Sequence, residues 1–411
     1  MSRGLGDVYK RQDREKSALL PGKFQENLVL VRSTDIGPGE PSPLTDDLVD
    51  AVAKVVAESG GVSVFDRREV VGAEFPLTED RSQTIALQSS QIAEDGNRFG
   101  RIVVKNATTG EVIWSSAGSD GSMALRSARP TADHAETLLR QANQIAGIVA
   151  DAYLKLHLNS RGDIAASALC KQGAAHFFRL GKTNFEIADH LFERAYEIEP
   201  KGIYMGWRSY LRTFMLAERQ FQDRDRLMEE ALSFIRSALE DDPYNSYILS
   251  FAAQVHYLVS RSYVATYEFA ERSVELNPAN PIGWSLLGTA KCYLGDLAGG
   301  LQDSDFAVRI GGGVPYRYHL LGQGCIANTL AHNTNHAKRL GELSHIVAPH
   351  YAPPLRYLAV LHFHDGDEAA SWEMVSKLRV SEPDFSFATL KDESYPSAGL
   401  ARSGLLDRLP D

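Results

Sequence analysis

Prolines recur at a nearly constant interval through the second half of this chain, each directly after a polar or acidic helix end. The segments EIEP, LEDDP, ELNP, IVAP and VSEP end at Pro200, Pro243, Pro278, Pro349 and Pro383. The steps are 43, 35, 71 and 34 residues, and the longest divides into 34 and 37 if Gly312 takes the place of a proline. Proline ends a helix because it lacks an N–H and clashes with the preceding turn. A period near 34 residues therefore predicts a solenoid of paired helices.

The unit with the clearest pattern is Pro281–Val314. Trp284, Leu287 and Gly288 have the spacing W-x2-L-G, and Gly295-Asp296-Leu297 has the composition of a turn. Small residues let helices approach closely, so Ala307 suits the second helix of a pair. This pattern resembles the tetratricopeptide (TPR) repeat, whose helix pairs bury their apolar faces only by stacking on their neighbours.

The other stops divide the chain into similar units. We expect about six helix pairs in an all-α superhelix over residues 166–385, followed by a tail or capping segment over 386–411. The step of 43 residues predicts either an insertion near Gln220–Arg226 or a longer first helix around Trp207–Leu216. An unrelated helical bundle with chance prolines is the alternative. The expected units are Leu169–Lys201, Gly202–Pro243, Tyr247–Asn280, Pro281–Val314, Tyr318–His350 and Ala352–Pro383.

A β–α–β unit is predicted near the N-terminus. Asn27–Ser33 is an apolar run typical of a buried strand, and Val62–Phe65 is a second one. Between them, Asp47–Ser59 places five apolar side chains on one helix face, and Gly60-Gly61 ends that helix. Such a unit is expected to be parallel and right-handed.

An antiparallel meander and a long helix follow. Gln83–Ser90, Gly100–Asn106 and Glu111–Ser115 are short strand-like runs separated by turn formers. Thr131–Leu158 has the periodicity of one amphipathic helix. Residues 27–160 are therefore expected to form an α/β module in front of the superhelix.

The hairpin segment of this module carries a resemblance. Asn106-Ala107-Thr108-Thr109-Gly110-Glu111-Val112-Ile113-Trp114 is similar to the D-A-x-T-G-x-x-x-W hairpin of the FlgO or TolB N-terminal type of module. Leu28–Val31 and Thr45–Val52 stand where those proteins have their first strand and helix. In bacterial regulators of this kind the module precedes TPR repeats, behind a CadC-like winged-helix DNA-binding domain or, less often, a class III adenylate cyclase domain.

Residues 1–12, MSRGLGDVYKRQ, look like the in-frame translation of a sequencing adaptor rather than native sequence. We expect residues 13–26 to be a linker and the natural gene to have been cut at or before Asp13. The resemblance then implies a missing output domain upstream.

Sequence motifs of catalysis, cofactor binding and metal binding were not found. The chain has no phosphate loop, no H-E-x-x-H and no paired C-x-x-C. His332 and His336 are four apart but flank an expected turn, so packing or surface roles are favoured over a metal site. The cysteines are expected to be small buried residues, and we predict no enzyme, no cofactor and no metal. They are Cys170, Cys292 and Cys325.

Partner binding is expected in the groove lined by the first helices of the repeats. The residues at the usual exposed groove positions are mostly apolar or aromatic and would suit a helix or an extended apolar segment of a partner. The alternative is that this face packs on the N-terminal module or on a second copy, so self-association is also possible on this reading. The predicted groove residues are Ile248, Phe251, Val255, Ser285, Thr289, Tyr293, His319 and Arg356.

The functional expectation is a non-catalytic sensory and protein-interaction module of a bacterial transcriptional regulator. The formal net charge of −10 argues against direct nucleic-acid binding by this part of the protein. No stretch of 18 apolar residues is present, so no membrane span is predicted here. We expect the cytoplasm, or the periplasm if an upstream transmembrane helix has been lost. The alternatives are the regulatory TPR region of a class III adenylate cyclase and a scaffold for envelope assembly.

Overall fold

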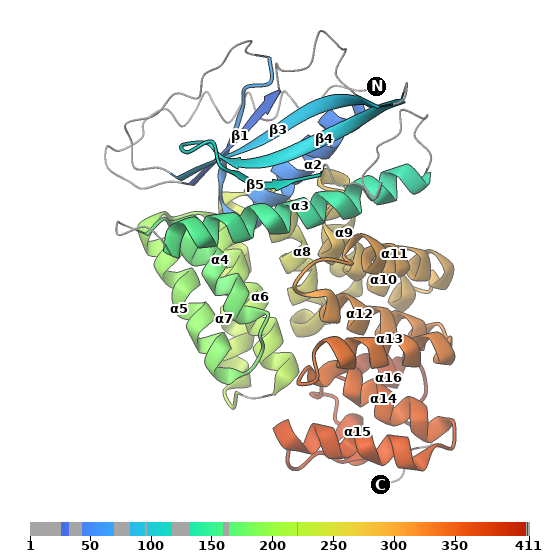
Figure 1. Ribbon diagram of the computed structural model, residues 1–411. Helices are drawn as coiled ribbons and strands as arrows, with labels where there is room; N and C mark the ends of the chain where they lie inside the picture. The colour runs from blue at the N-terminus through green and yellow to red at the C-terminus, as the bar shows by residue number, and fades with distance from the viewer. Residues whose placement is uncertain are drawn as a thin grey trace.

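A small α/β layer lies across one edge of a superhelix of helix pairs (Figure 1). The computed structural model describes residues 26–32, 43–69, 83–94, 97–116, 132–158, 164–219, 221–407 and 409. The adaptor-like residues 1–12 and all but the last residue of the predicted linker lie outside this range.

The sheet has five strands in the order β2-β1-β3-β4-β5. β1 pairs in parallel with β2 and with β3, whereas β3, β4 and β5 are antiparallel neighbours. Both the predicted β–α–β unit and the predicted meander are therefore present, and β1 joins them. The strands are β1 (Glu26–Arg32), β2 (Ser63–Asp66), β3 (Gln83–Glu94), β4 (Asn97–Asn106) and β5 (Val112–Ser115).

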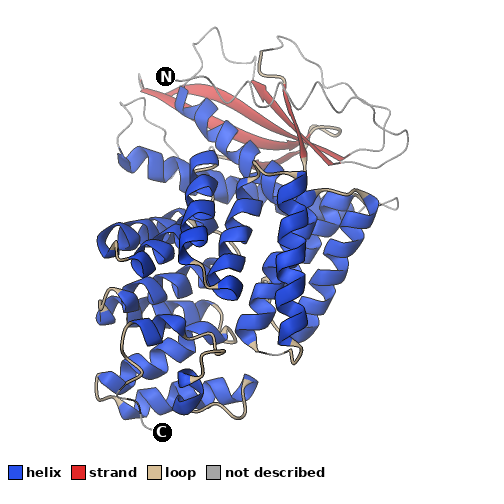
Figure 2. Ribbon diagram, turned by 180° about the vertical axis from the view of Figure 1, so that it is seen from behind, coloured by secondary structure: helices blue, strands red, loops and turns tan. Residues whose placement is uncertain are grey.

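Two helices, α2 (Pro43–Gly60) and α3 (Ala132–Leu158), lie between the sheet and the superhelix (Figures 1 and 2). The apolar face predicted for α2 is buried, and Val49 and Val52 are fully inaccessible. Gly61 ends the helix with φ +68°, a left-handed conformation that favours glycine. The pattern of α2 thus fixes which of its faces meets the sheet.

Six helix pairs follow, as the stops predict. The 43-residue step arises mainly from longer helices, because α6 has 17 residues and α7 has 18, against 14 in each of α10 and α11. The pairs are α4 (Ala166–Phe177) with α5 (Lys182–Ile198), α6 (Gly202–Glu218) with α7 (Arg224–Asp241), α8 (Ser246–Val255) with α9 (Tyr263–Leu276), α10 (Pro281–Leu294) with α11 (Leu297–Ile310), α12 (Arg317–Leu330) with α13 (Thr334–Val347), and α14 (Ala352–His364) with α15 (Glu368–Ser381).

Shorter elements complete this part of the chain. The π-helical turn η1 (His256–Ser260) continues α8, and a C-terminal segment over residues 386–407 contains the 3-10 helix η2 (Phe387–Lys391) and α16 (Ala398–Arg402). The arrangement is a TPR superhelix preceded by an α/β layer.

An asparagine two residues after a helix-ending proline begins the next helix pair. The Asn280 side chain accepts hydrogen bonds from the main-chain N–H groups of Ile282 and Gly283, and Asn245 does the same for Tyr247 and Ile248. These caps satisfy N–H groups that have no partner within the helix. The proline stop and the asparagine cap together set the sharp turn between neighbouring repeats.

Glycines in the W-x2-L-G unit allow α10 and α11 to touch. A Cβ atom added to Gly288 would lie 2.6 Å from the carbonyl oxygen of Gly300 and 2.7 Å from the main-chain nitrogen of Ser304. Both neighbours are backbone atoms of the partner helix, so they cannot rotate away. The glycine of the motif is required by this close approach.

We therefore expect Gly288→Ala to destabilise the protein by roughly 1–2 kcal/mol. Overpacking costs about 1–3 kcal/mol, which exceeds the gain of up to about 1 kcal/mol that alanine brings to a helix interior. Gly313→Ala is the matched control because an added Cβ would meet nothing within 4 Å. Urea denaturation followed by circular dichroism measures both, and a Gly288→Ala protein as stable as the Gly313→Ala protein would contradict the close approach.

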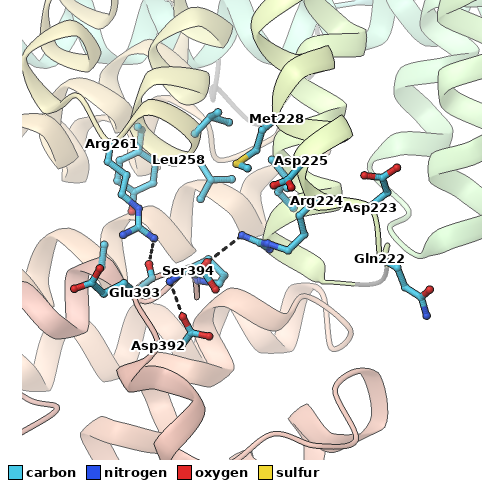
Figure 3. Close-up of a pocket in the computed structure, with 15 residues that line it drawn as sticks. Gln222, Asp223, Arg224, Asp225, Met228, Leu258, Arg261, Asp392, Glu393 and Ser394 are labelled. Atoms are coloured by element: carbon cyan, nitrogen blue, oxygen red, sulfur yellow. Dashed lines mark hydrogen bonds between the residues drawn. The ribbon is translucent and has the colours of Figure 1, made fainter.

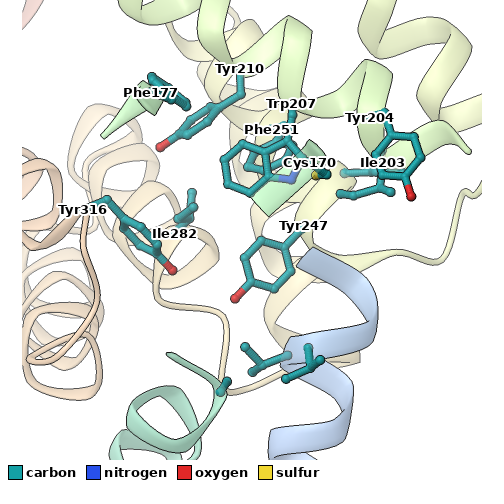
Figure 4. Close-up of a cluster of buried hydrophobic side chains, with 14 of the residues drawn as sticks. Cys170, Phe177, Ile203, Tyr204, Trp207, Tyr210, Tyr247, Phe251, Ile282 and Tyr316 are labelled. Carbon is teal, nitrogen blue, oxygen red and sulfur yellow. The ribbon is translucent and has the colours of Figure 1, made fainter. Parts of the chain in front are cut away.

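The α/β layer shares a hydrophobic core with the earlier repeats (Figure 4), whereas the last repeats and the C-terminal segment form a second cluster. Trp207 on α6 donates to the carbonyl of Ser59 on α2 at 2.8 Å. Asn143 on α3 donates to the carbonyl of Ala279 at 2.9 Å, and Lys171 on α4 forms a buried ion pair with Glu26 on β1. The layer is therefore packed against the repeats rather than tethered to them.

Candidate functional site

The residues predicted to line an exposed groove are all buried in the structure. Their exposed fractions range from 0% to 4%, so the open position expected for them is wrong. They are Ile248, Phe251, Val255, Ser285, Thr289, Tyr293, His319 and Arg356.

Within the described residues this face is closed rather than open, because the first helices of distant repeats pack on one another. The ring of Phe178, after α4, lies 5.0 Å from that of Tyr316, before α12. The ring of Phe214 on α6 lies 4.9 Å from that of His319 on α12. The superhelix thus closes around its own aromatic side chains, so neither the α/β layer nor a second copy is needed to cover this face.

His319 is a core histidine in this arrangement. Its Nδ1 atom lies 2.9 Å from the hydroxyl of Tyr351, and burial lowers the pKa of the imidazole to about 3. The ring is therefore neutral at physiological pH. The Nδ1 contact and the neutral ring both fit a packing role.

Arg356 is the centre of a buried polar cluster that joins the second and sixth helix pairs of the superhelix. Its Nη2 atom donates to Glu382 Oε1 at 2.6 Å and to the carbonyl of Ala217 at 2.7 Å. The hydroxyl of Tyr395 donates to the second oxygen of Glu382, also at 2.6 Å. We call Arg356, Glu382, Tyr395 and Glu218 the latch, because they connect α6, α14 and the C-terminal segment.

Glu218 is the titratable member of the latch. It is fully buried, and this burial raises the pKa of its carboxyl to about 8, against the opposing effects of Arg356 and the main-chain N–H of Ala352. At pH 7 the carboxyl is therefore mostly protonated in the folded protein.

This shift predicts a pH-dependent stability. In the unfolded chain the carboxyl of Glu218 ionises near pH 4.3, whereas in the folded chain it holds its proton up to about pH 8. Since the folded state binds more protons in this window, its stability falls as the pH rises from about 4.5 to 8. Glu218→Gln stays neutral, so we expect it to be more stable than wild type by about 2–4 kcal/mol at pH 8 and similar to it at pH 4. Denaturant midpoints across this range measure the difference, and parallel pH profiles for the two proteins would contradict it.

One cavity of about 870 Å³ lies where the α6–α7 turn, η1 and the C-terminal segment meet (Figure 3). We call it the α7–η1 pocket. Its lining residues are Leu216, Gln222, Asp223, Arg224, Asp225, Met228, Tyr257, Leu258, Val259, Arg261, Asp392, Glu393, Ser394, Pro396 and Ala398. A smaller cavity of about 370 Å³ shares Arg261, Asp392, Glu393 and Ala398 with it, so residues 392–398 run between the two.

Two arginines of the α7–η1 pocket hold this segment by its main chain. Arg224 Nη2 donates to the carbonyl of Ser394 at 3.0 Å, and Arg261 donates to the carbonyl of Glu393 (Figure 3). Among the described residues neither guanidinium has a carboxylate oxygen within 4.0 Å. Burial, Arg219 and Arg261 together lower the pKa of Arg224.

Arg224, Arg261 and Tyr395 were not predicted as functional residues from the sequence. The two arginines have main-chain acceptors, which leave no pattern in the sequence. The one available signal is the turn chemistry of Asp392-Glu393-Ser394-Tyr395-Pro396 directly after η2.

The histidines and cysteines agree with packing or surface roles. His332 lies in the turn between α12 and α13 with φ +57°, but α13 begins at Thr334, so His336 is a helix residue and the turn precedes the predicted Asn333–Asn335. Within the described residues no group of three His, Cys, Asp or Glu side chains could hold a metal ion. Cys170, Cys292 and Cys325 are buried and unpaired with one another, and burial raises the pKa of the Cys170 thiol to about 12.

Over the part of the chain described, no helix combines the length and apolar character needed to cross a membrane.

Comparisons with known proteins give fold-level likenesses only. No model of a known protein family matches the sequence, and no curated protein matches it. The human IFIT1 dimer with m7Gppp-AAAA is 15% identical with a TM-score of 0.45, and the match covers 62% of each chain. YrrB, a TPR protein with an unusual peptide-binding site, is 18% identical with a TM-score of 0.28, over 47% of this chain and 93% of YrrB. Yeast Tom70 is 12% identical with a TM-score of 0.33, over 68% and 61%. This chain thus spans less than two thirds of the length of the IFIT1 chain.

Proposed function

We propose that this chain is a non-catalytic protein-interaction module that binds a segment of a partner protein in the α7–η1 pocket. The observation that carries the proposal is that Arg224 and Arg261 already hold main-chain carbonyl groups of a non-helical segment there. Main-chain recognition of this kind lets a protein hold a peptide in a fixed direction. The cavity beside the segment leaves room for additional residues of a partner.

The buried inner face of the superhelix supports the α7–η1 pocket as the binding surface. Because the inner face of the superhelix is filled with aromatic side chains, a partner would have no access to the residues first expected to bind it. The α7–η1 pocket instead lies at the rim, where Gln222 and Asp223 are exposed.

Site-specific photo-crosslinking in cells tests this function. A photoreactive phenylalanine analogue at Gln222 is expected to capture a partner protein, identified by mass spectrometry, and the double change Arg224→Ala with Arg261→Ala should abolish the capture. Arg226→Ala is the matched control, because Arg226 lies on the same helix with its side chain 64% exposed. A probe at Val380, which is 83% exposed on α15, should capture nothing specific. Capture that survives the double change would contradict the proposal.

We further infer that the module belongs to a bacterial transcriptional regulator of the CadC-like type and works in the cytoplasm. The support is the hairpin at Ala107–Gly110, which carries the motif similar to the FlgO or TolB N-terminal module. Sequencing of the genomic locus tests this proposal, because the gene should then also encode a winged-helix domain. A class III cyclase domain there would favour the regulatory part of a cyclase, and a signal peptide would favour an envelope scaffold.

This part of the protein is not expected to bind DNA itself. Its formal net charge is −10, and phosphate contacts require clustered basic side chains. Fluorescence anisotropy with a labelled duplex at about 0.15 M salt should show no saturable binding. A sub-micromolar dissociation constant that weakens steeply with salt would overturn this expectation.

A further inference from the structure

Residues 392–396 form a turn that is held together by its own hydrogen bonds. The main-chain N–H of Tyr395 donates to the carbonyl of Asp392 at 2.9 Å. The N–H of Ser394 donates to the side chain of Asp392 at 2.8 Å. A short peptide with this sequence would therefore carry much of its bound shape by itself, which reduces the entropy lost on binding.

The superhelix recognises only one side chain of this turn closely. Asp392, Glu393 and Ser394 are exposed, whereas Tyr395 is 1% exposed. The guanidinium groups of Arg219 and Arg356 lie 4.8 and 4.9 Å from the centre of the tyrosine ring. The hydroxyl of the tyrosine donates to Glu382 at 2.6 Å. The ring and the hydroxyl group of Tyr395 are thus both contacted by side chains of the superhelix. The preceding residues, Glu393 and Ser394, are held by their main-chain carbonyl groups.

The C-terminal segment leaves hydrogen-bonding capacity of this site unused. Buried guanidinium nitrogens of Arg219, Arg224 and Arg356 have no acceptor among the described residues. The pocket of about 870 Å³ adjoins the turn, and Arg224 lines this pocket. A buried donor without an acceptor destabilises the state that contains it, so a segment that supplied acceptors here would bind more tightly than the chain's own.

We propose that the α7–η1 pocket and the latch form a tyrosine-reading peptide site, occupied in cis by residues 392–396, whose partner is a protein that presents an exposed Asp-x-x-Tyr turn. The inference rests on the proposed function and specifies its partner. In this state the chain's own turn competes with the partner, because a tethered segment has an effective concentration on the order of mM. Release of the C-terminal segment therefore determines whether the partner can bind.

Peptide binding to the full chain tests the proposal. The probe is a fluorescein-labelled synthetic peptide with the sequence of residues 389–399, TLKDESYPSAG. We expect it to bind the full chain carrying Tyr395→Ala at least tenfold more tightly than wild type, because the variant loses the competing side chain. A peptide with alanine in place of the tyrosine should bind the same variant at least tenfold more weakly. Equal affinity of the two peptides would overturn the tyrosine reading.

A second variant guards against misfolding of the first. Tyr395→Phe keeps the ring under Arg219 and Arg356 and loses only the hydrogen bond to Glu382, so its packing is preserved. It should bind the tyrosine peptide more tightly than wild type does. If both variants give native near-ultraviolet circular dichroism and neither binds the peptide, the proposal is wrong.

The outcomes also separate this inference from the proposed function. A crosslink from position 222 that persists while the tyrosine peptide fails to bind would leave the partner-binding function standing and remove only the tyrosine reading. Concentration-dependent dimers of the wild-type chain that Tyr395→Ala abolishes would assign the site to the turn of a second copy and overturn the assignment to another protein. Light scattering after size-exclusion chromatography measures the dimers.

Discussion

Phe251→Ala is expected to lower the free energy of unfolding by about 3–5 kcal/mol. The side chain is fully buried, and its ring lies 4.5 Å from that of Tyr210 and 4.7 Å from that of Trp207. Truncation to alanine therefore leaves a cavity between α8 and the two aromatic rings on α6. Because these helices are held by their other contacts, they cannot move together to fill it. Urea denaturation followed by tryptophan fluorescence measures the loss.

The control for this experiment is Val380→Ala, which removes methyl groups from a side chain that is 83% exposed and should change stability by less than about 0.5 kcal/mol. The comparison also decides between the predicted and observed positions of Phe251. A side chain in an open groove would lose little stability on truncation and would instead weaken partner binding. That result would restore the groove prediction.

Arg356→Ala should be comparably damaging, at about 3–5 kcal/mol, because it removes one partner of a buried ion pair. The side chains of Arg356 and Glu382 are 0% and 6% exposed. Without the guanidinium, the partners left to the carboxylate of Glu382 among the described residues are the hydroxyl of Tyr395 and the weaker, 3.7 Å contact with Arg219. The carbonyl of Ala217 loses the hydrogen bond that links α6 to α14.

A double-mutant cycle of Arg356→Met with Glu382→Gln isolates the coupling between the two latch residues. Removing both charges should destabilise the protein by less than the sum of the single changes, since neither charge is then left unpaired. Arg226→Ala is the surface control, because its pairs with Asp223 and Glu230 are long and exposed and contribute about 0–1 kcal/mol. Additive single and double changes would show that the ion pair does not hold the second and sixth helix pairs together.

The repeats were predictable because their signals are local. A proline stop, an asparagine cap and a glycine at the helix crossing act within about 35 residues of one another, so the period of the sequence shows them directly. The order of strands and helices in the α/β layer was predictable for the same reason. What the local pattern could not give was the parallel pairing of β1 with β3, which joins segments more than 50 residues apart.

The state of the inner face depends on contacts that no local pattern encodes. Whether Phe251 and His319 face solvent depends on how tightly six pairs curl, and small rotations at each repeat interface add up to that curvature. The hydrogen bond from Arg356 to the carbonyl of Ala217 joins α14 to α6 across 139 residues of sequence. Arg224 and Arg261 donate to main-chain carbonyl groups, so the sequence contains no complementary acidic side chain that would indicate their role.

The contact between α6 and α14 also changes how the array should unfold. In an open solenoid each repeat touches only its neighbours, so terminal repeats fray and the chain can lose its structure step by step. Here the second and sixth pairs are joined, and α2 and α3 pack on α4, α6 and α11 from outside. No pair is therefore terminal in the usual sense, and loss of one removes contacts from several. The six helix pairs should melt in a single cooperative transition, and the amide protons of α4–α15 should exchange from a common globally unfolded state rather than from independently opening terminal repeats.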